Sequence, residues 1–206
     1  MTKYLLNGRS LINIVGVCLT ITLIAAAEAL AQGSNIGDDP IQVGRKDAPI
    51  KLEVFYDMQC PSCANFHPIL KAAIAKYQDQ LLVTFRHFPI SFHDKAFLAG
   101  MAVEAAKQQK KGFEMLDMLL LNQAEWAWSP KFRAKIDAYA KKLGLDLRKF
   151  RADLNGSQAE GRMIKDMERG KQLKVGAAPT VFLNGRILAY PDAMNLDEVI
   201  SNALNK

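Results

Sequence analysis

The chain has 206 residues, with 27 Lys and Arg against 21 Asp and Glu, a net charge of +6 and 50% hydrophobic residues. This composition is typical of a globular protein and excludes a disordered tail, a collagen-like chain, a disulfide-dense miniprotein and a multi-span membrane protein. The mild positive charge is not gathered into a Lys/Arg block, so it indicates no nucleic-acid partner.

The amino terminus has the pattern of a secretory signal peptide. A basic start leads into an uncharged, mostly aliphatic stretch over residues 10–27, and Ala29-Leu30-Ala31 supplies a cleavage site. We predict a signal peptide over residues 1–31 and a linker over residues 32–40; the alternative is an uncleaved membrane anchor. Both place the rest of the chain outside the cytoplasmic membrane, in the periplasm or another extracytoplasmic compartment.

Hydrophobic periodicity divides the remaining chain into a β-α-β segment, a purely helical block and a β-β-α segment. The predicted strands cover residues 41–43, 51–56, 81–85, 180–183 and 186–188, and the predicted helices cover 60–77, 96–106, 113–121, 132–143, 147–154, 157–173 and 196–204. A β-α-β run of this length favours parallel strands. The block over residues 93–173 is predicted to be an insertion, so residues 41–92 and 174–206 form one α/β domain.

The segment Cys60-Pro61-Ser62-Cys63 is the strongest functional pattern. It begins a predicted helix, where Pro61 suits the first turn and unpaired backbone N–H groups face Cys60. Cys63 lies on the same helix face, so the two sulfurs can meet. Because a disulfide across a two-residue spacer is a poor structural staple, we predict a redox pair, with Cys60 as the exposed nucleophile and Cys63 as the buried resolving thiol.

Half of a zinc or copper site is the alternative interpretation of this pair. It requires further ligands, and His67 is the one histidine that could share the face of Cys63. We expect His67 to be a partly exposed helix residue, His87 to lie on a strand and His93 to lie near a helix start. The spacing therefore favours redox chemistry, and we predict neither a resident metal nor a cofactor.

Several motifs together give the chain a family resemblance. They lie at residues 43–44, 47–49, 55–63, 86–89, 175–180 and 182–186. With these motifs the chain resembles the DsbA-like thiol:disulfide oxidoreductases of the thioredoxin superfamily. The resemblance covers nearly the whole mature chain. It implies an α/β fold, the thioredoxin fold, with an inserted all-helical subdomain, which matches the predicted order of elements.

The resemblance also implies roles for individual residues. Pro179 is expected to follow a cis peptide bond and to face the cysteines, and Ala178, Pro179 and Thr180 are expected to bind an extended substrate strand. Pro61 and Ser62 form the dipeptide between the cysteines. Its second member is Ser62, whereas the strongest oxidants of the family have His there, so a less oxidising pair is expected.

A second departure concerns the proton acceptor. Many relatives carry a buried carboxylate six residues before the first cysteine, where this chain has Val54. Glu53 and Asp57 are therefore the candidates for a proton relay. Strand alternation turns Glu53 to the opposite face, so we expect it to be a paired structural charge, with Asp57 as the substitute.

The predicted function is an exported dithiol oxidase acting on unfolded or reduced secreted proteins. A membrane redox partner would reoxidise the pair, and we expect a monomer because residues 32–40 leave no room for the amino-terminal domain through which family isomerases dimerise. The alternatives are an isomerase or reductase of the same fold and a copper- or zinc-binding protein. Trp126 and Trp128 are expected to pack inside the helical block, with substrate contact as the alternative.

Overall fold

The computed structural model describes residues 39–205. The predicted signal peptide and most of the predicted linker lie outside the described residues. Residues 39–205 belong to one compact unit, which runs from Gly37 to the end of the chain. Within the described part of the chain, no helix is both long and apolar enough to cross a membrane.

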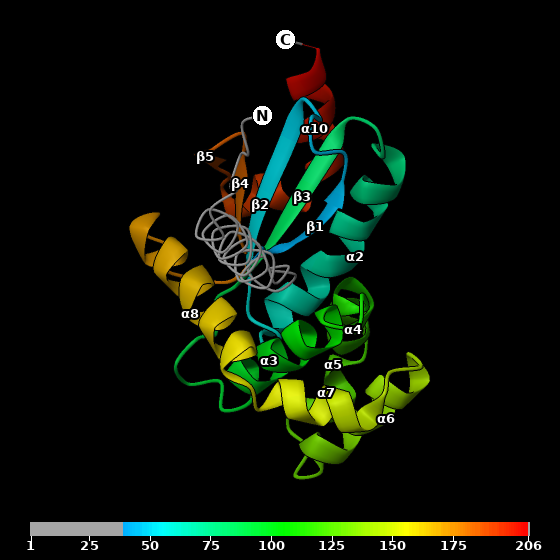
Figure 1. Cartoon of the computed structure of the whole chain (residues 1–206). Helices are drawn as coiled ribbons and strands as arrows, with labels where there is room; N and C mark the ends of the chain where they lie inside the picture. The colour runs from blue at the N-terminus through cyan, green and yellow to red at the C-terminus, as the bar shows by residue number, and fades with distance from the viewer. Residues whose placement is uncertain (1–38, 206) are drawn as a thin grey trace, which may run out of the picture. The chain divides into compact units, whose positions relative to one another are not determined.

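A five-stranded mixed sheet forms the centre of the fold, in the order β1-β3-β2-β4-β5 (Figure 1). The strands are β1 (Ile41–Gly44), β2 (Ile50–Tyr56), β3 (Leu81–His87), β4 (Thr180–Leu183) and β5 (Arg186–Ile187). β2 and β3 are parallel, as predicted from the helix that connects them. β1 is an edge strand, antiparallel to β3.

The β4–β5 hairpin turns at Asn184-Gly185, as predicted. Both residues have positive φ, 47° and 80°, which is the backbone of a type I′ turn and explains the Asn-Gly pair. β5 ends one residue earlier than expected, although the amide of Leu188 still donates to the carbonyl of Val181 at 2.8 Å. The hairpin therefore continues the ladder briefly beyond the strand.

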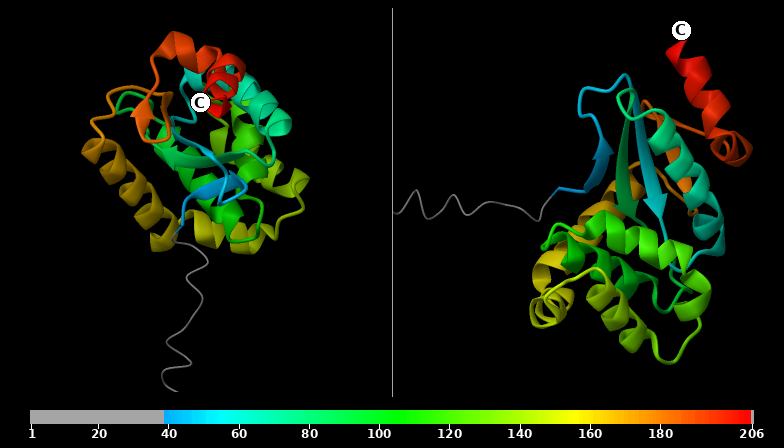
Figure 2. Two further views of the ribbon diagram at one scale, coloured as in Figure 1. Left: turned by 90° about the horizontal axis from the view of Figure 1, so that it is seen from above. Right: turned by 90° about the vertical axis from the view of Figure 1, so that its right-hand side faces the viewer.

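Alternation along β2 directs its side chains to two different layers. Leu52, Val54 and Tyr56 join the main hydrophobic core, in which helix α2 (Pro61–Lys76) packs. Phe55 points the other way, into a smaller cluster with Val175 and Phe182. In Figure 2, α2 and α10 (Leu196–Leu204) lie on one side of the sheet and α8 (Ser157–Gln172) lies on the other.

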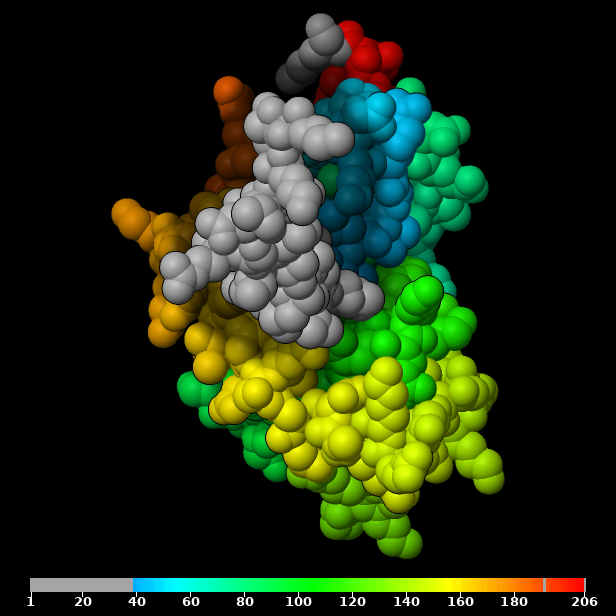
Figure 3. Space-filling view, in the orientation of Figure 1, coloured from blue at the N-terminus to red at the C-terminus, as the bar shows by residue number. Residues whose placement is uncertain are grey.

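All elements between β3 and β4 are helical, as predicted. They are α3 (Ala96–Lys107), α4 (Gly112–Leu121), α5 (Gln123–Trp126), α6 (Phe132–Lys142), α7 (Leu147–Leu154) and α8. In the space-filling view the later helices form a continuous surface coloured from yellow-green to orange (Figure 3). The fold class is therefore confirmed as a thioredoxin-like α/β sheet with a helical insertion.

Local signals explain which helix ends were predicted correctly. Asp146 caps α7 by accepting from the amide of Lys149, and Gly144 follows α6 with a φ of 74°. The helices α5 and α9 (Tyr190–Met194) were missed because each is too short to show a period. Although Ser129-Pro130 has the pattern of a cap for α6, the N-cap is Lys131, and the Ser129 hydroxyl accepts from the amide of Lys131.

Two burial predictions were also wrong. His67 is fully buried, because it packs beside Tyr56 and its Nε2 lies 2.9 Å from Asp117 Oδ1. Trp126 packs inside the block as expected, and its ring N–H donates to the carbonyl of Leu119. Trp128, in contrast, is 70% exposed because it follows the end of α5 and points out of the block.

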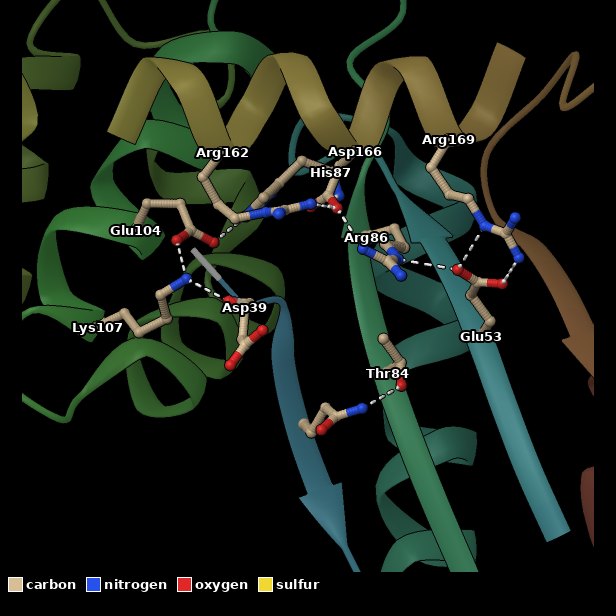
Figure 4. Close-up of polar contacts among 11 residues, drawn as sticks. Asp39, Glu53, Thr84, Arg86, His87, Glu104, Lys107, Arg162, Asp166 and Arg169 are labelled. Atoms are coloured by element: carbon tan, nitrogen blue, oxygen red, sulfur yellow. Dashed lines mark hydrogen bonds and ion pairs between the residues drawn. The ribbon is translucent and has the colours of Figure 1, made fainter. Parts of the chain in front are cut away.

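A group of charged residues, about half of them buried, connects α8 to the sheet, and we call it the anchor network (Figure 4). At its centre the Asp166 carboxylate accepts from Arg86, from Arg162 and from the amide of His87. Its members are Glu53, Arg86, His87, Glu104, Lys107, Arg162, Asp166 and Arg169. Because these residues come from β2, β3, α3 and α8, the network fixes the insertion against the sheet.

Candidate active site

The cysteine pair lies where β2 leads into α2. Cys60 is the N-cap of α2, with extended backbone angles, and Pro61 is the first helical residue. A proline loses nothing there because that position has no intrahelical N–H bond to give up. The amides of Cys63 and Ala64 both donate to the carbonyl of Cys60, so the first turn is formed.

Cys60 is less accessible than predicted. It is 7% exposed, whereas Cys63 is 0% exposed, and both are free thiols. Cys60 is therefore the more exposed of the two cysteines, as expected, but it is buried and the expectation of an exposed thiol was wrong. A loop more than a hundred residues away contributes to this burial, because the Cys60 thiol donates to the carbonyl of Ala178 at 3.3 Å.

The pKa values of the two thiols are shifted in opposite directions. The pKa of Cys60 is lowered to about 6, first by a hydrogen bond from the Cys63 thiol and then by the amides of Cys63 and Ser62, against the opposing effects of burial and Asp57. Burial raises the pKa of Cys63 well above its ordinary value. At pH 7 a pKa near 6 leaves about 90% of Cys60 as the thiolate, so Cys60 is the nucleophile and leaving group of the pair.

The loop beside Cys60 has the geometry that the family resemblance implied. The peptide bond between Ala178 and Pro179 is cis. Ala178 is buried, whereas Pro179 and Thr180 are partly exposed. The Thr180 hydroxyl donates to the carbonyl of Ala177 at 2.7 Å. A partly open backbone segment therefore lies directly against the reactive sulfur.

Two glutamines that were not predicted hold the turn before Cys60. Gln123 donates to the carbonyls of Met58 and Cys60 at 2.8 and 3.0 Å. Gln59 donates to the carbonyl of Ala127 and accepts from the amide of Lys95. The insertion thus supports the active-site turn directly. Neither glutamine belongs to a periodic pattern or a motif that would have marked it in the sequence.

The two candidates for a proton relay occupy different places. Glu53 belongs to the anchor network, where it forms ion pairs with Arg86 and Arg169, as expected of a structural charge. Asp57 is buried at the active site, and its own amide donates to Cys63 Sγ at 3.4 Å. Its carboxylate also meets His93, which was expected only to lie near a helix start.

No metal-binding group is evident near the cysteines. The Nε2 atom of His67, the histidine that could have shared their face, is occupied by Asp117. Within residues 39–205, no three side chains of His, Cys, Asp or Glu come together in a way that could hold a metal ion.

Comparison with known proteins places this site in a family. A family profile described as thioredoxin matches residues 37–202. The chain belongs to the thioredoxin family. Within the described residues, the helical insertion between β3 and β4 gives the chain a DsbA-like architecture, with Cys60 and Cys63 as a Cys-x-x-Cys pair at the start of α2.

Individual relatives are of two kinds. A probable disulfide bond formation protein D of Bacillus cereus is 29% identical over 172 residues, covering 80% of this chain and 78% of that protein. The Na(+)/H(+) antiporter NhaA 1 of Mycolicibacterium gilvum is 34% identical over 146 residues, covering 69% of this chain. The chain spans only 23% of that antiporter's length.

The fold itself is similar to solved structures. Oxidised BdbD of Bacillus subtilis superposes with a TM-score of 0.69 at 20% identity, covering 82% of this chain and 98% of that one. At this identity the likeness concerns the fold, and the chemistry is argued from the residues of this chain.

Proposed function

We propose that this chain is an exported dithiol oxidase that introduces disulfides into unfolded or reduced secreted proteins. The observation that carries the proposal is the contrast within the pair: Cys60 has a pKa of about 6, whereas the pKa of buried Cys63 is raised. A stabilised Cys60 thiolate is a good leaving group, which favours release of an oxidised substrate.

The reaction consists of two exchanges. A substrate thiolate attacks Cys60 Sγ of the Cys60–Cys63 disulfide, a mixed disulfide forms and Cys63 leaves as a thiolate that takes up a proton. A second substrate thiolate then attacks the substrate sulfur of the mixed disulfide, and Cys60 leaves as a thiolate. Two electrons pass from the substrate to the protein. A membrane redox partner that delivers them to quinone would reform the disulfide.

The loop of Ala178, Pro179 and Thr180 is the proposed binding site for an extended substrate segment. It lies against Cys60, and two of its three residues are partly exposed. Because Cys60 is only 7% exposed, an extended segment reaches it more easily than the surface of a folded protein does. This requirement favours unfolded substrates over folded ones.

Exposed apolar side chains near the turn support the same kind of substrate. Phe92 is 76% exposed and precedes His93, and Trp128 is 70% exposed and follows Ala127, whose carbonyl binds Gln59. Leu121, half-exposed, lines a groove together with Pro61. Such side chains on a surface are typical of sites that bind apolar segments.

Oxidative refolding of a reduced substrate protein with two cysteines tests the proposal. We expect the oxidised chain to form the substrate disulfide stoichiometrically and Cys60→Ser to be inactive. Cys63→Ser has no disulfide of its own, and we expect it to accumulate a mixed disulfide through Cys60 when oxidised glutathione is added as the oxidant. Undiminished refolding by Cys60→Ser would rule the proposal out. Faster rescue of a scrambled disulfide than of a reduced chain would instead favour an isomerase.

Export is tested separately. If residues 1–31 are a cleaved signal peptide, the protein recovered from the extracytoplasmic fraction of its host begins at Gln32. Recovery of the full-length chain in the membrane fraction would show the anchor alternative, and recovery in the cytoplasm would contradict both.

A further inference from the structure

The Asp57 carboxylate is buried in the turn before Cys60, and all of its acceptor positions are used. Its Oδ1 accepts from the amides of Gln59 and Cys60, at 2.7 and 3.1 Å. Its Oδ2 accepts from the amide of Ile90 and from His93 Nδ1, both at 2.7 Å. A carboxylate offers about four lone-pair sites. Four donors therefore occupy all the acceptor positions of the Asp57 carboxylate.

The charge of Asp57 is not matched by a permanent cation. Within the described residues, His93 is its one titratable hydrogen-bond partner, and three backbone N–H dipoles supply the rest. The other charged groups of this turn are Asp94 and Lys95, which pair with each other. Backbone dipoles stabilise a carboxylate, but they leave its net negative charge in place.

That charge acts on both sulfurs. The amide of Asp57 donates to Cys63 Sγ, and the amide of Cys60 donates to the Asp57 carboxylate, so one short turn links all three residues. In this arrangement the charge of Asp57 raises the pKa of Cys60, against the hydrogen bonds that lower it. The same charge raises the pKa of Cys63, whereas the hydrogen bond from the Asp57 amide lowers the pKa of Cys63 by more. The active site thus contains a group that opposes its own thiolate.

We propose that the buried Asp57–His93 pair sets the redox balance of Cys60 and Cys63, with Asp57 disfavouring the thiolate of the reduced form and His93 positioning and partly compensating the carboxylate. The proposal rests on the proposed thiol exchange and adds two residues that regulate its equilibrium. Reduction of the pair breaks its S–S bond, adds two electrons and leaves a thiolate at Cys60. A group that destabilises this thiolate shifts the equilibrium toward the disulfide and makes the pair less oxidising.

This inference also changes the interpretation of Asp57 as a proton relay. A relay must accept a proton, and a carboxylate with four donors has no vacant acceptor position. Asp57 acts instead through its fixed charge. His93 lies 36 residues further along the chain than Asp57 and contacts it only in the folded protein, so His93 is a positioning residue that acts through Asp57.

The test measures two quantities. One is the equilibrium between the dithiol and the disulfide of Cys60 and Cys63 in mixtures of reduced and oxidised glutathione, and the other is the pKa of Cys60 from the pH dependence of its alkylation. Asp57→Asn is expected to lower the pKa of Cys60 and to shift the equilibrium about tenfold toward the reduced protein, which is about 30 mV for two electrons. Asp94→Asn is the matched control, because it removes a 67% exposed carboxylate next to His93 while an asparagine keeps an oxygen that can accept from Gln59. It is expected to change neither quantity.

His93 is tested by a double-mutant cycle. His93→Ala is expected to shift the equilibrium about threefold toward the disulfide, and to have no effect in the Asp57→Asn background. An equal shift in both backgrounds, or a shift toward the reduced protein, would overturn the role of His93. His93→Gln keeps a donor and is expected to stay nearer to the wild type than His93→Ala.

Two results would overturn the whole proposal. One is an unchanged Cys60 pKa and glutathione equilibrium in Asp57→Asn. The other needs no variant: carbon NMR of the wild-type Asp57 carboxylate should show an anion throughout the titration of Cys60, and uptake of a proton in that range would restore a relay. Because these measurements concern only the Cys60–Cys63 pair, they test the role of Asp57 and His93 even if the chain fails to oxidise substrate proteins.

Discussion

Two buried carboxylate sites lie next to β2, and they are stabilised in different ways. In the anchor network, Asp166 meets the guanidinium groups of Arg86 and Arg162, which cancel its charge. At the active site, Asp57 meets backbone N–H groups and His93. Cations neutralise a carboxylate, whereas dipoles only solvate it. The first arrangement therefore serves to hold elements together, and the second leaves a charge that can act on nearby sulfurs.

The groups that set the acidity of Cys60 are also separate from the anchor network. The groups that shift its pKa are Cys63, Ser62 and Asp57, all within the active-site turn and the start of α2. No member of the anchor network is among them. Changes in the network should therefore alter the stability of the fold without altering the chemistry of the pair, and the following predictions test this separation.

The largest expected effect is the loss of Asp166. Asp166→Ala removes a fully buried carboxylate and leaves Arg86 and Arg162 without their shared partner. Breaking a buried ion pair on one side typically costs about 3–5 kcal/mol of unfolding free energy. Urea denaturation should show this loss. The pKa of Cys60 in the folded variant should stay at about 6, and a clear shift would contradict the separation of the two sites.

The next effect is a dependence of stability on pH that is specific to the reduced protein. The folded pKa of Cys60 is lowered to about 6, so its stabilising contribution is present above the unfolded pKa, near 8.5, and is lost as the pH falls toward 6. A shift of this size corresponds to about 3 kcal/mol. Cys63 acts in the opposite direction only above about pH 8.5, because it then ionises in the unfolded chain while its raised pKa keeps it protonated in the folded protein.

Denaturation of the reduced and oxidised proteins between pH 5.5 and 9 measures this contribution. The stability of the reduced protein relative to the oxidised protein should fall as the pH is lowered, and Cys60→Ser should abolish the dependence. A flat difference across this range would contradict the lowered pKa of Cys60.

A smaller effect is expected where α8 meets the sheet. A Cβ atom at Gly170 would lie 2.6 Å from the ring of Phe88, so Gly170→Ala forces the ring or the helix to move. Overpacking of this kind costs about 1–3 kcal/mol. Thermal denaturation should show the loss, and Gly161→Ala, on the same helix with open space around it, is the control that should not be destabilised. Equal losses at both positions would argue against close packing at Gly170.

The smallest effect is expected at the solvent-facing end of the network. Arg169 pairs with Glu53 but is nearly half exposed, and such pairs contribute about 0–1 kcal/mol. Arg169→Ala should therefore change the unfolding free energy by less than about 1 kcal/mol and should leave the glutathione equilibrium unchanged. A loss comparable to that of Asp166→Ala would show that the network acts as one cooperative unit.

Features that depend on neighbours in the chain could be predicted from the sequence. The Cys-x-x-Cys pair at a helix start, the Asn184-Gly185 turn and the Asp146 cap each arise within a few residues. The parallel pairing of β2 and β3 followed from the length of their connection. The cis bond before Pro179 was expected only through the family resemblance, since the local sequence does not distinguish it from a trans turn.

Tertiary structure alone decided how the reactive cysteine is surrounded. Gln123 reaches the carbonyl of Cys60 across 63 residues of sequence, and His93 reaches Asp57 across 36. Local periodicity does not encode such contacts, because they depend on where the insertion returns the chain to the sheet. For the same physical reason the local pattern predicted a thiol open to solvent, whereas Cys60 is 7% exposed and contacts the distant loop at Ala178.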